Sequence, residues 1–184
     1  MRLTRLRSTL FVVFAVIGVV VTAACGGDSS PAATTHNATD DAFVVAMARH
    51  HQRAIEVGQF AADKGSDPRV VDYGRLIVSQ QTPELQKLDG WKSQWSLLST
   101  AAGSSMPDGY ITDPTLAGLR TMSGTAFDRA FLLDSANSET GAAAMAQREL
   151  ASGVYGPARE LATSISTAPT TQIPKLRALA AQLG

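Results

Sequence analysis

The spacing of apolar side chains constrains this chain more than any other feature of its sequence. From Asp41 onward, residues suited to a helix interior recur at alternating intervals of four and three, in the series Phe43, Met47, His50, Ala54, Val57 and Ala61. This spacing places the series along one side of an α-helix, which can then pack against partner helices. No segment alternates apolar and polar residues over a useful strand length. The sequence therefore predicts an all-α fold.

Residues that start or stop helices divide the first half into two long helices. Asp40 or Asp41 is expected to cap the first helix, because a short acidic side chain accepts hydrogen bonds from free backbone N–H groups. A second helix is expected to begin after Asp67, where a proline suits the first helical position. Pro83 lies inside this second helix and lacks a backbone donor. We expect the helix to kink there or to restart with Thr82 as its cap.

The second half is expected to contain one further long helix and several shorter ones. The expected order is a polar loop over 99–112, a short helix over 113–124, a long helix over 126–150 and two short helices over 157–166 and 174–183. The last two pieces take the place of a fourth long helix.

The two halves also repeat at an interval of 88 residues. Phe43 recurs as Phe131, and the pair His50-His51 corresponds to Ser138-Glu139. A helix pair that occurs twice, and cannot close a core alone, packs most simply as an antiparallel four-helix bundle. We therefore expect residues 41–184 to form one bundle domain built from two helix pairs, with the short extra helix in the connecting segment.

The first residues have the pattern of a secretory signal peptide. Basic residues occur within 2–7, an apolar run occupies 10–21, and small residues follow directly before Cys25. The apolar run is shorter than the roughly 20 residues that a bilayer-spanning helix needs. We interpret residues 1–24 as a signal peptide that exports the rest of the chain.

Cys25 is the only cysteine in the sequence. Small residues before a lone cysteine resemble the lipobox of bacterial lipoproteins, although Thr22 stands where Leu or Val is usual. We expect Cys25 to be lipidated and residues 25–40 to form a flexible tether, with ordinary cleavage near Ala24 as the alternative. The protein would then be anchored at the extracytoplasmic face of the bacterial cell membrane.

Composition excludes several classes of protein and partner. A single cysteine excludes a disulfide-stapled scaffold. The 16 basic residues balance the 16 acidic ones, but three of the arginines lie in the leader, so the body is mildly acidic. Because the body has no basic cluster, nothing indicates a nucleic-acid partner. Protein partners are not defined by the sequence.

Met47, His50 and His51 are the residues whose chemistry stands out. Met47 lies one turn before the two histidines, so a thioether and two imidazoles share one patch of the first helix. Thioether and imidazole ligands favour Cu(I), whereas Mg²⁺ and Ca²⁺ prefer oxygen. Met145 and Glu139 on the repeated helix are candidates to complete such a site.

A structural role for the same side chains is the competing interpretation. A buried histidine is commonly hydrogen-bonded, here to a carbonyl group or to Gln80, Gln81 or Glu84, and methionine often only fills a core. Motifs for di-iron bundles, zinc proteases, nucleotide-binding loops and serine hydrolases are absent from the sequence. We therefore do not expect an enzyme.

The sequence also resembles a bacterial family, the "domain of unknown function 305". The first-half motif is Phe43-x-x-x-Met47-x-x-His50-His51-x-x-Ala54-Ile55-Glu56, followed by Gln81-x-x-Glu84-Leu85 and Trp91, and the second-half motif is Gly124-x-x-Phe127-Asp128-Arg129-x-Phe131-Leu132. The resemblance covers about residues 41–183. It implies a ferritin-like helical bundle, exported or lipid-anchored, with members linked to copper binding through Met and His.

This chain departs from the family pattern in its second half. The family usually repeats Met and His-His there, but this sequence has Ser135, Ser138 and Glu139, and the methionine-rich loop is reduced to Met106. Only Met47, His50 and His51 carry over as ligands. Two hypotheses follow. Either the protein binds or buffers copper at the envelope, or it is a bundle without metal that acts as a structural or protein-interaction module.

Overall fold

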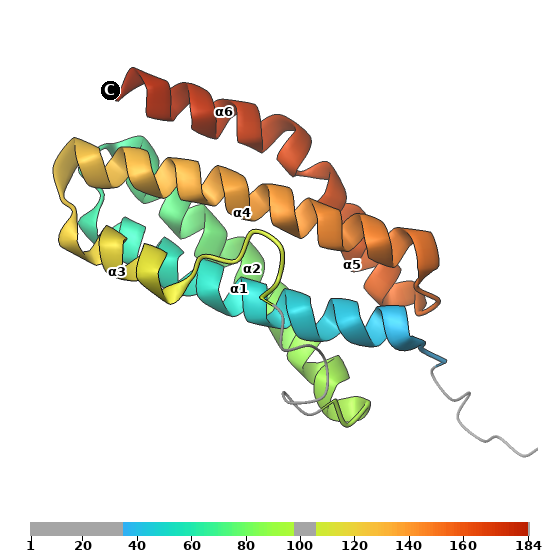
Figure 1. Ribbon diagram of the computed structural model, residues 1–184. Helices are drawn as coiled ribbons and strands as arrows, with labels where there is room; N and C mark the ends of the chain where they lie inside the picture. The colour runs from blue at the N-terminus through green and yellow to red at the C-terminus, as the bar shows by residue number, and fades with distance from the viewer. Residues whose placement is uncertain (1–34, 98–105, 184) are drawn as a thin grey trace, which may run out of the picture. The chain divides into compact units, whose positions relative to one another are not determined.

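The computed structural model describes residues 35–97 and 106–183. They form α1 (Ala38–Lys64), α2 (Pro68–Gln94), α3 (Asp113–Thr121), α4 (Gly124–Ser152), α5 (Gly156–Thr167) and α6 (Pro169–Gln182), shown in Figure 1. No strand occurs in these two ranges, so the predicted all-α fold is confirmed. The predicted signal peptide and Cys25 lie outside the described residues. None of the described helices is long and apolar enough to cross a membrane.

The start of α1 differs from the sequence prediction. The N-cap is Asn37, whose side chain accepts hydrogen bonds from the backbone N–H groups of Thr39 and Asp40. The Asp40 carboxylate accepts in return from the Asn37 backbone N–H at 2.7 Å, which completes a capping box. Capping by Asp40 or Asp41 is therefore wrong, and α1 begins inside the segment expected to be a tether.

Pro83 does not interrupt α2. The expected restart at Thr82 is wrong, because α2 runs continuously through Pro83 and the Thr82 hydroxyl donates to the Val78 carbonyl at 2.6 Å. Pro83 is exposed, and so is Ser79, whose carbonyl loses its helical donor and can bond to water instead. The buried face of α2 keeps its packing on both sides of the proline, as fully buried Leu88 shows.

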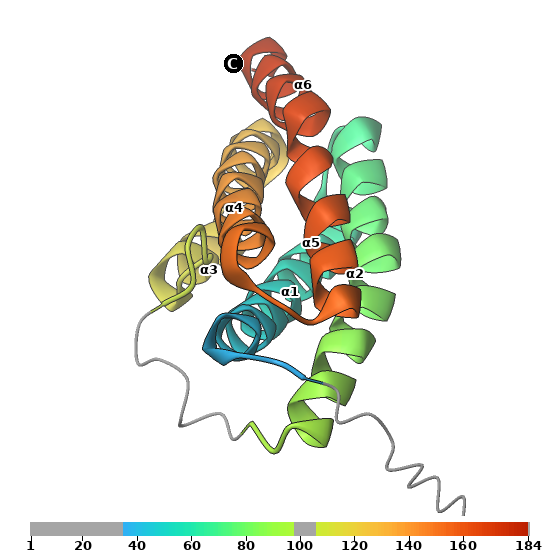
Figure 2. The same ribbon diagram turned by 90° about the vertical axis from the view of Figure 1, so that its right-hand side faces the viewer.

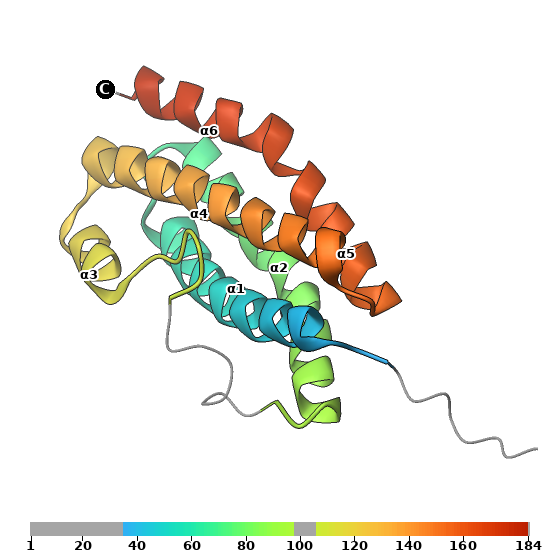
Figure 3. The same ribbon diagram turned by 45° about the vertical axis from the view of Figure 1, so that its right-hand side comes forward.

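Helices α1 and α2 form an antiparallel hairpin with a close crossing. A Cβ atom on Gly74 would lie 2.6 Å from the Gly58 carbonyl oxygen, so only glycine fits at this point. Helix α4 packs on α1, and the successive helices α5 and α6 both pack on α4 (Figure 3). In Figure 2, α4 lies on the left, α2 on the right, and α5 and α6 follow one another. Side chains of α1, α2, α4 and α6 share one apolar cluster. The expectation of two short helices in the fourth position is confirmed, although α6 begins at Pro169.

Two buried aspartates show that the sequence repeat is also a structural repeat. The Asp128 carboxylate accepts from the backbone N–H groups of 66–67, in the turn between α1 and α2, at 3.0 and 2.7 Å. Asp40 accepts from the N–H groups of 154–155, in the turn between α4 and α5, at 3.1 and 2.9 Å. Both the aspartates and the turns are separated by 88 residues. Helix α4 thus binds the turn that follows α1, and α1 binds the turn that follows α4.

The interior consists of two apolar clusters. The first includes Ala54, Val57, Ile77, Phe131 and Leu176, and the second includes Phe43, Met47, Leu88, Met145 and Leu161. On α1, the two histidines fall between the parts of the helix that enter each cluster. A layer of polar side chains therefore crosses the bundle between two apolar halves.

Candidate functional site

The candidate site is built on His50 and His51 in the middle of α1. Consecutive helix residues point about 100° apart, so the two imidazoles leave α1 toward different partner helices. His50 contacts Ser138 of α4, and His51 contacts Glu84 of α2. Each histidine is only 2% exposed. Both predicted histidines are therefore inside the bundle, with ring centroids 6.1 Å apart.

His50 is held by a residue of the second repeat. Its Nε2 atom lies 3.1 Å from the Ser138 carbonyl oxygen and 3.0 Å from the Ser138 hydroxyl. The other ring nitrogen, Nδ1, is buried and has no hydrogen-bond partner. Burial and the neighbouring His51 lower the pKa of His50 to about 4, so this imidazole is neutral near pH 7.

His51 is held within the first repeat. Its Nε2 atom lies 2.8 Å from the Glu84 carboxylate, and the Glu84 side chain is 25% exposed. Like His50, His51 has a buried Nδ1 atom without a partner. These contacts are the ones that the structural interpretation predicted, a carbonyl group for one histidine and Glu84 for the other.

Met47 is fully buried at the edge of the second apolar cluster, one turn before the histidines. Met145 belongs to the same cluster and is also buried. Glu139 lies instead in the polar layer, where the Tyr73 hydroxyl donates to its carboxylate at 3.3 Å. Burial raises the pKa of Glu139, and nearby Glu84 raises it further, although the Tyr73 hydrogen bond opposes this. The structure thus puts the two candidate supplementary ligands in different surroundings.

Other polar residues lie in this layer, and among them Tyr73 and the two serines were not predicted from the sequence as part of the site. Tyr73, Gln81, Ser135, Ser138 and Glu139 are among the residues that line a small cavity of about 10 Å³, roughly the space of one water molecule. The Gln81 side-chain oxygen is buried there without a hydrogen-bond partner. The 88-residue offset was the signal that could have found the two serines, because it aligns Ser135 with Met47 and Ser138 with His50.

Carboxylates and histidines alone do not form a metal centre in the described part of the chain. Over 35–97 and 106–183, no group of three or more His, Cys, Asp or Glu side chains is arranged to hold a metal ion. A metal bound at the polar layer would therefore need a ligand of another residue type beside the two imidazoles, and the Met47 sulfur is a candidate. The unpartnered Nδ1 atoms fit this requirement, since each is a buried nitrogen that lacks the partner expected in a folded protein.

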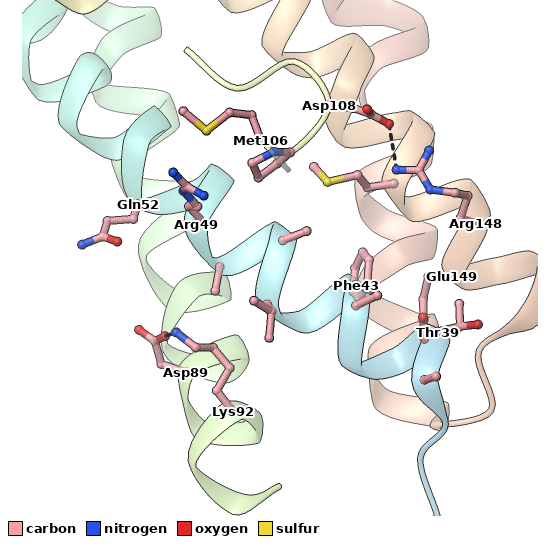
Figure 4. A pocket seen from close by; sticks show the side chains of 17 residues that line it. Thr39, Phe43, Arg49, Gln52, Asp89, Lys92, Met106, Asp108, Arg148 and Glu149 are labelled. Carbon is pink, nitrogen blue, oxygen red and sulfur yellow. Dashed lines mark hydrogen bonds and ion pairs between the residues drawn. The ribbon is translucent and has the colours of Figure 1, made fainter. Parts of the chain in front are cut away.

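A larger groove of about 800 Å³ opens along α1, away from the histidines (Figure 4). Helix α2, helix α4 and the segment 106–108 form its walls. An ion pair between Arg148 and Asp108, 2.7 Å long, lies on its rim, and Met106 and Arg49 also line it. Of the candidate ligands, Met145 is among the residues that line this groove, whereas Met47 and the histidines are not.

Glu149 is a further buried acidic group, near the end of α4. Its side chain is fully buried and interacts with the Asp40 carboxylate. Burial and the adjacent Asp40 raise the pKa of Glu149 to about 8, while Arg159 opposes the shift. Glu149 is therefore mainly protonated near neutral pH.

These features define a class of protein: an antiparallel four-helix bundle whose interior is crossed by a buried layer of histidine, serine and carboxylate side chains. Residues 40–180 match the family model described as "Domain of unknown function (DUF305)", and the chain belongs to this family. The resemblance stated from the sequence motifs is confirmed.

Solved structures share the fold. A DUF305 protein of Streptomyces coelicolor, described as secreted, is 23% identical with a TM-score of 0.74, over 79% of this chain and 94% of that one. CopM in its Cu(I)-bound form is 22% identical with a TM-score of 0.64, over 78% and 96% of the two chains. A DUF305 fragment of Deinococcus radiodurans is 18% identical with a TM-score of 0.67, over 79% and 97%. No match was found among the curated proteins.

Proposed function

We propose that this protein is an exported, lipid-anchored protein of the bacterial cell envelope that binds and sequesters Cu(I) through Met47, His50 and His51. One observation carries the proposal. Two buried imidazole nitrogens, the Nδ1 atoms of His50 and His51, have no partner and lie on the same helix as the fully buried Met47 thioether. A ligand that accepts their lone pairs would satisfy both atoms.

The donor set determines which metal is favoured. Two imidazole nitrogens and one thioether sulfur are soft to intermediate donors, which suit Cu(I) better than Mg²⁺ or Ca²⁺. Met145 or Glu139 could add a fourth donor. Met145 would supply a second thioether from the cluster that contains Met47, and Glu139 would supply a carboxylate from the polar layer. The sequence contains none of the catalytic motifs considered above, and the role that we propose is to bind the ion.

Comparison with known structures supports copper as the metal to test. CopM has been crystallised in Cu(I)-bound, Cu(II)-bound and Ag-bound forms. At 22% identity this likeness shows the fold alone. The assignment of copper to this chain therefore rests on its own Met and His side chains.

Export and lipid anchoring are proposed from the leader. A basic start, a short apolar run and small residues before Cys25 support processing as a lipoprotein. Labelling bacteria with a palmitate analogue should mark the wild-type protein and leave a Cys25→Ala variant unmarked. Equal labelling of both would overturn the lipid anchor without affecting the copper site.

The copper test is an anaerobic titration of the purified protein with Cu(I) against a competing chelator. The test variant combines Met47→Leu, His50→Gln and His51→Gln. Glutamine keeps a donor N–H near the position of histidine Nε2, so it can still bond to Ser138 or Glu84 while the Nδ1 atom is removed. The matched control combines His36→Gln with Met122→Leu, which removes the same residue types outside the layer. We expect one tightly bound Cu(I) in wild type and control, and at least about 100-fold weaker binding in the test variant.

A structural role remains the second candidate, because one observation favours it. The His50 hydrogen bond to Ser138 joins the two repeats through the core, as that role requires. If this were the whole function, wild type and test variant would take up Cu(I) equally. That result would overturn the copper proposal.

A further inference from the structure

The hydrogen-bond partners of the two histidines decide which ring nitrogen carries the proton. His50 Nε2 lies 3.1 Å from the Ser138 carbonyl oxygen, which can only accept, and 3.0 Å from the Ser138 hydroxyl, which can accept or donate. An N–H on Nε2 can donate to both oxygens. An unprotonated Nε2 would direct its lone pair at the lone pairs of the carbonyl oxygen. A carboxylate oxygen is also an acceptor, so His51 Nε2 presents an N–H to Glu84 at 2.8 Å.

Fixing the proton on Nε2 leaves the lone pair of a neutral imidazole on Nδ1. In both histidines Nδ1 is the buried atom without a partner. Histidines that bind metals through one nitrogen usually donate from the other nitrogen to a carboxylate or a backbone carbonyl. His51 with Glu84 is the first of these arrangements, and His50 with Ser138 is the second.

We propose that Glu84 of α2 is a positioning residue for the metal site, an inference that rests on the proposed Cu(I) binding. Together with the Ser138 carbonyl, it holds both imidazoles in the Nε2–H tautomer, so that both Nδ1 lone pairs are available to one ion. Glu84 does not itself contact the ion. It acts through the ring of His51.

Glu84 also supplies charge. Two neutral imidazoles and a thioether bring no negative charge, and a cation without a compensating charge is costly to bury. The Glu84 carboxylate bonds to the outer nitrogen of His51, so its negative charge lies across the ring from the proposed ion. This charge offsets part of the cost of burying a cation beside two imidazoles.

The tautomers can be measured without any metal. Nitrogen-15 NMR of histidine-labelled, metal-free protein distinguishes Nε2–H, Nδ1–H and doubly protonated rings. We expect a proton on Nε2 of both buried histidines in the wild type. Glu84→Gln keeps an acceptor oxygen and should keep the tautomer of His51, whereas Glu84→Leu removes the acceptor and should give a mixture. Glu160→Gln, an exposed carboxylate on α5, is the matched control.

The same variants separate positioning from charge when Cu(I) affinity is measured by chelator competition. Glu84→Gln should bind Cu(I) about 10-fold more weakly because it loses only the charge, and Glu84→Leu up to about 100-fold more weakly because it loses the acceptor as well. Glu160→Gln should bind like the wild type. Circular dichroism confirms that each variant is folded, and Glu84→Gln, which keeps the shape and the acceptor, serves as the test if Glu84→Leu does not fold.

Several results would overturn the inference. An Nδ1–H tautomer at His51 in the wild type would contradict the assigned tautomer. An unchanged tautomer in Glu84→Leu, or Cu(I) affinities equal to the wild type in both Glu84 variants, would show that Glu84 does not position the site. If both histidines are Nε2–H but the wild type binds no Cu(I), the proposed function fails while the tautomer assignment stands.

Discussion

The two helix-pair repeats share a scaffold but differ in their interior. In each repeat a long helix carries a buried aspartate that binds the turn following the other long helix, Asp128 for 66–67 and Asp40 for 154–155. In the centre of the bundle the halves diverge, since the first half has His50-His51 where the second has Ser138-Glu139. Positions that hold the helices together match, whereas positions that could hold a ligand do not.

The candidate metal site is therefore asymmetric with respect to the two repeats, although the scaffold of the bundle is nearly symmetric. The second half does not supply a second imidazole pair, but it supplies the carbonyl that orients His50. One half would therefore provide the ligands and the other would provide part of their support. The predictions below test the shared scaffold and the divergent interior in turn.

The largest expected effect tests the shared scaffold. Asp128→Ala should lower the free energy of unfolding by about 4 kcal/mol, because it removes a buried carboxylate and leaves two N–H groups without their acceptor. Asp40→Ala should lower the free energy of unfolding by less, because it also removes one cause of the raised pKa of Glu149, which opposes folding at pH 7. Urea unfolding at pH 7 measures both, with exposed Asp63→Ala as the control. Equal stability of Asp128→Ala and wild type would contradict the role of these aspartates.

The next prediction uses the acid sensitivity of the first half. The pKa of His50 is about 4 in the folded chain and near 6.5 when unfolded, so the unfolded chain binds more protons between these values. Stability is therefore lost as pH falls from 6.5 toward 4. The wild type should lose about 3 kcal/mol more than His50→Gln between pH 7 and pH 4. Parallel pH profiles of the two metal-free proteins would contradict the burial of a neutral His50.

Glu149 should give the opposite pH dependence. Its pKa is raised to about 8, so the stability provided by its protonated form is present below its ordinary pKa and lost as pH rises toward 8. Glu149→Gln cannot ionise and should be about 2 kcal/mol more stable than the wild type at pH 8, with no gain at pH 4. Thermal unfolding at the two pH values measures the difference. A gain of equal size at both would show that ionisation of Glu149 is not the cause.

The smallest expected effect concerns the rim of the groove. Arg148 and Asp108 form an ion pair with both side chains more than half exposed. Arg148→Gln should change the free energy of unfolding by no more than about 0.5 kcal/mol, because exposed ion pairs contribute little. Cu(I) affinity should not change, since Arg148 lies outside the polar layer. A clear loss of affinity would place the metal in the groove instead.

Much of the fold could be predicted from local sequence patterns. The spacing of apolar residues along α1 and the 88-residue repeat indicated two helix pairs that form a bundle. The sequence also predicted that two short helices take the place of a fourth long helix, as the structure shows. The misplaced features depend on contacts between distant segments. Asp40 was predicted to be the N-cap of α1, but the N-cap is Asn37. The Asp40 carboxylate instead accepts hydrogen bonds that include those from the turn at 154–155. For Pro83 the sequence left a kink or a restart open, and α2 runs through it without a restart.

The candidate site was predictable only in part for the same reason. Met47, His50 and His51 follow from spacing along one helix, and Glu84 was one of three side chains considered as a histidine partner. That Ser138, 88 residues away, contacts His50 depends on the register between α1 and α4, which no local pattern gives. The unpartnered Nδ1 atoms likewise emerge only when all neighbouring helices are in place.

The most direct test of the copper site is X-ray absorption spectroscopy of the protein loaded with one equivalent of Cu(I) under anaerobic conditions. The asymmetric site predicts two nitrogen scatterers and at least one sulfur scatterer around the copper. The sulfur contribution should be lost in Met47→Leu unless Met145 supplies a second thioether, which Met145→Leu in the same background would then remove. A spectrum without nitrogen scatterers, or one unchanged when both histidines are replaced by glutamine, would contradict the account.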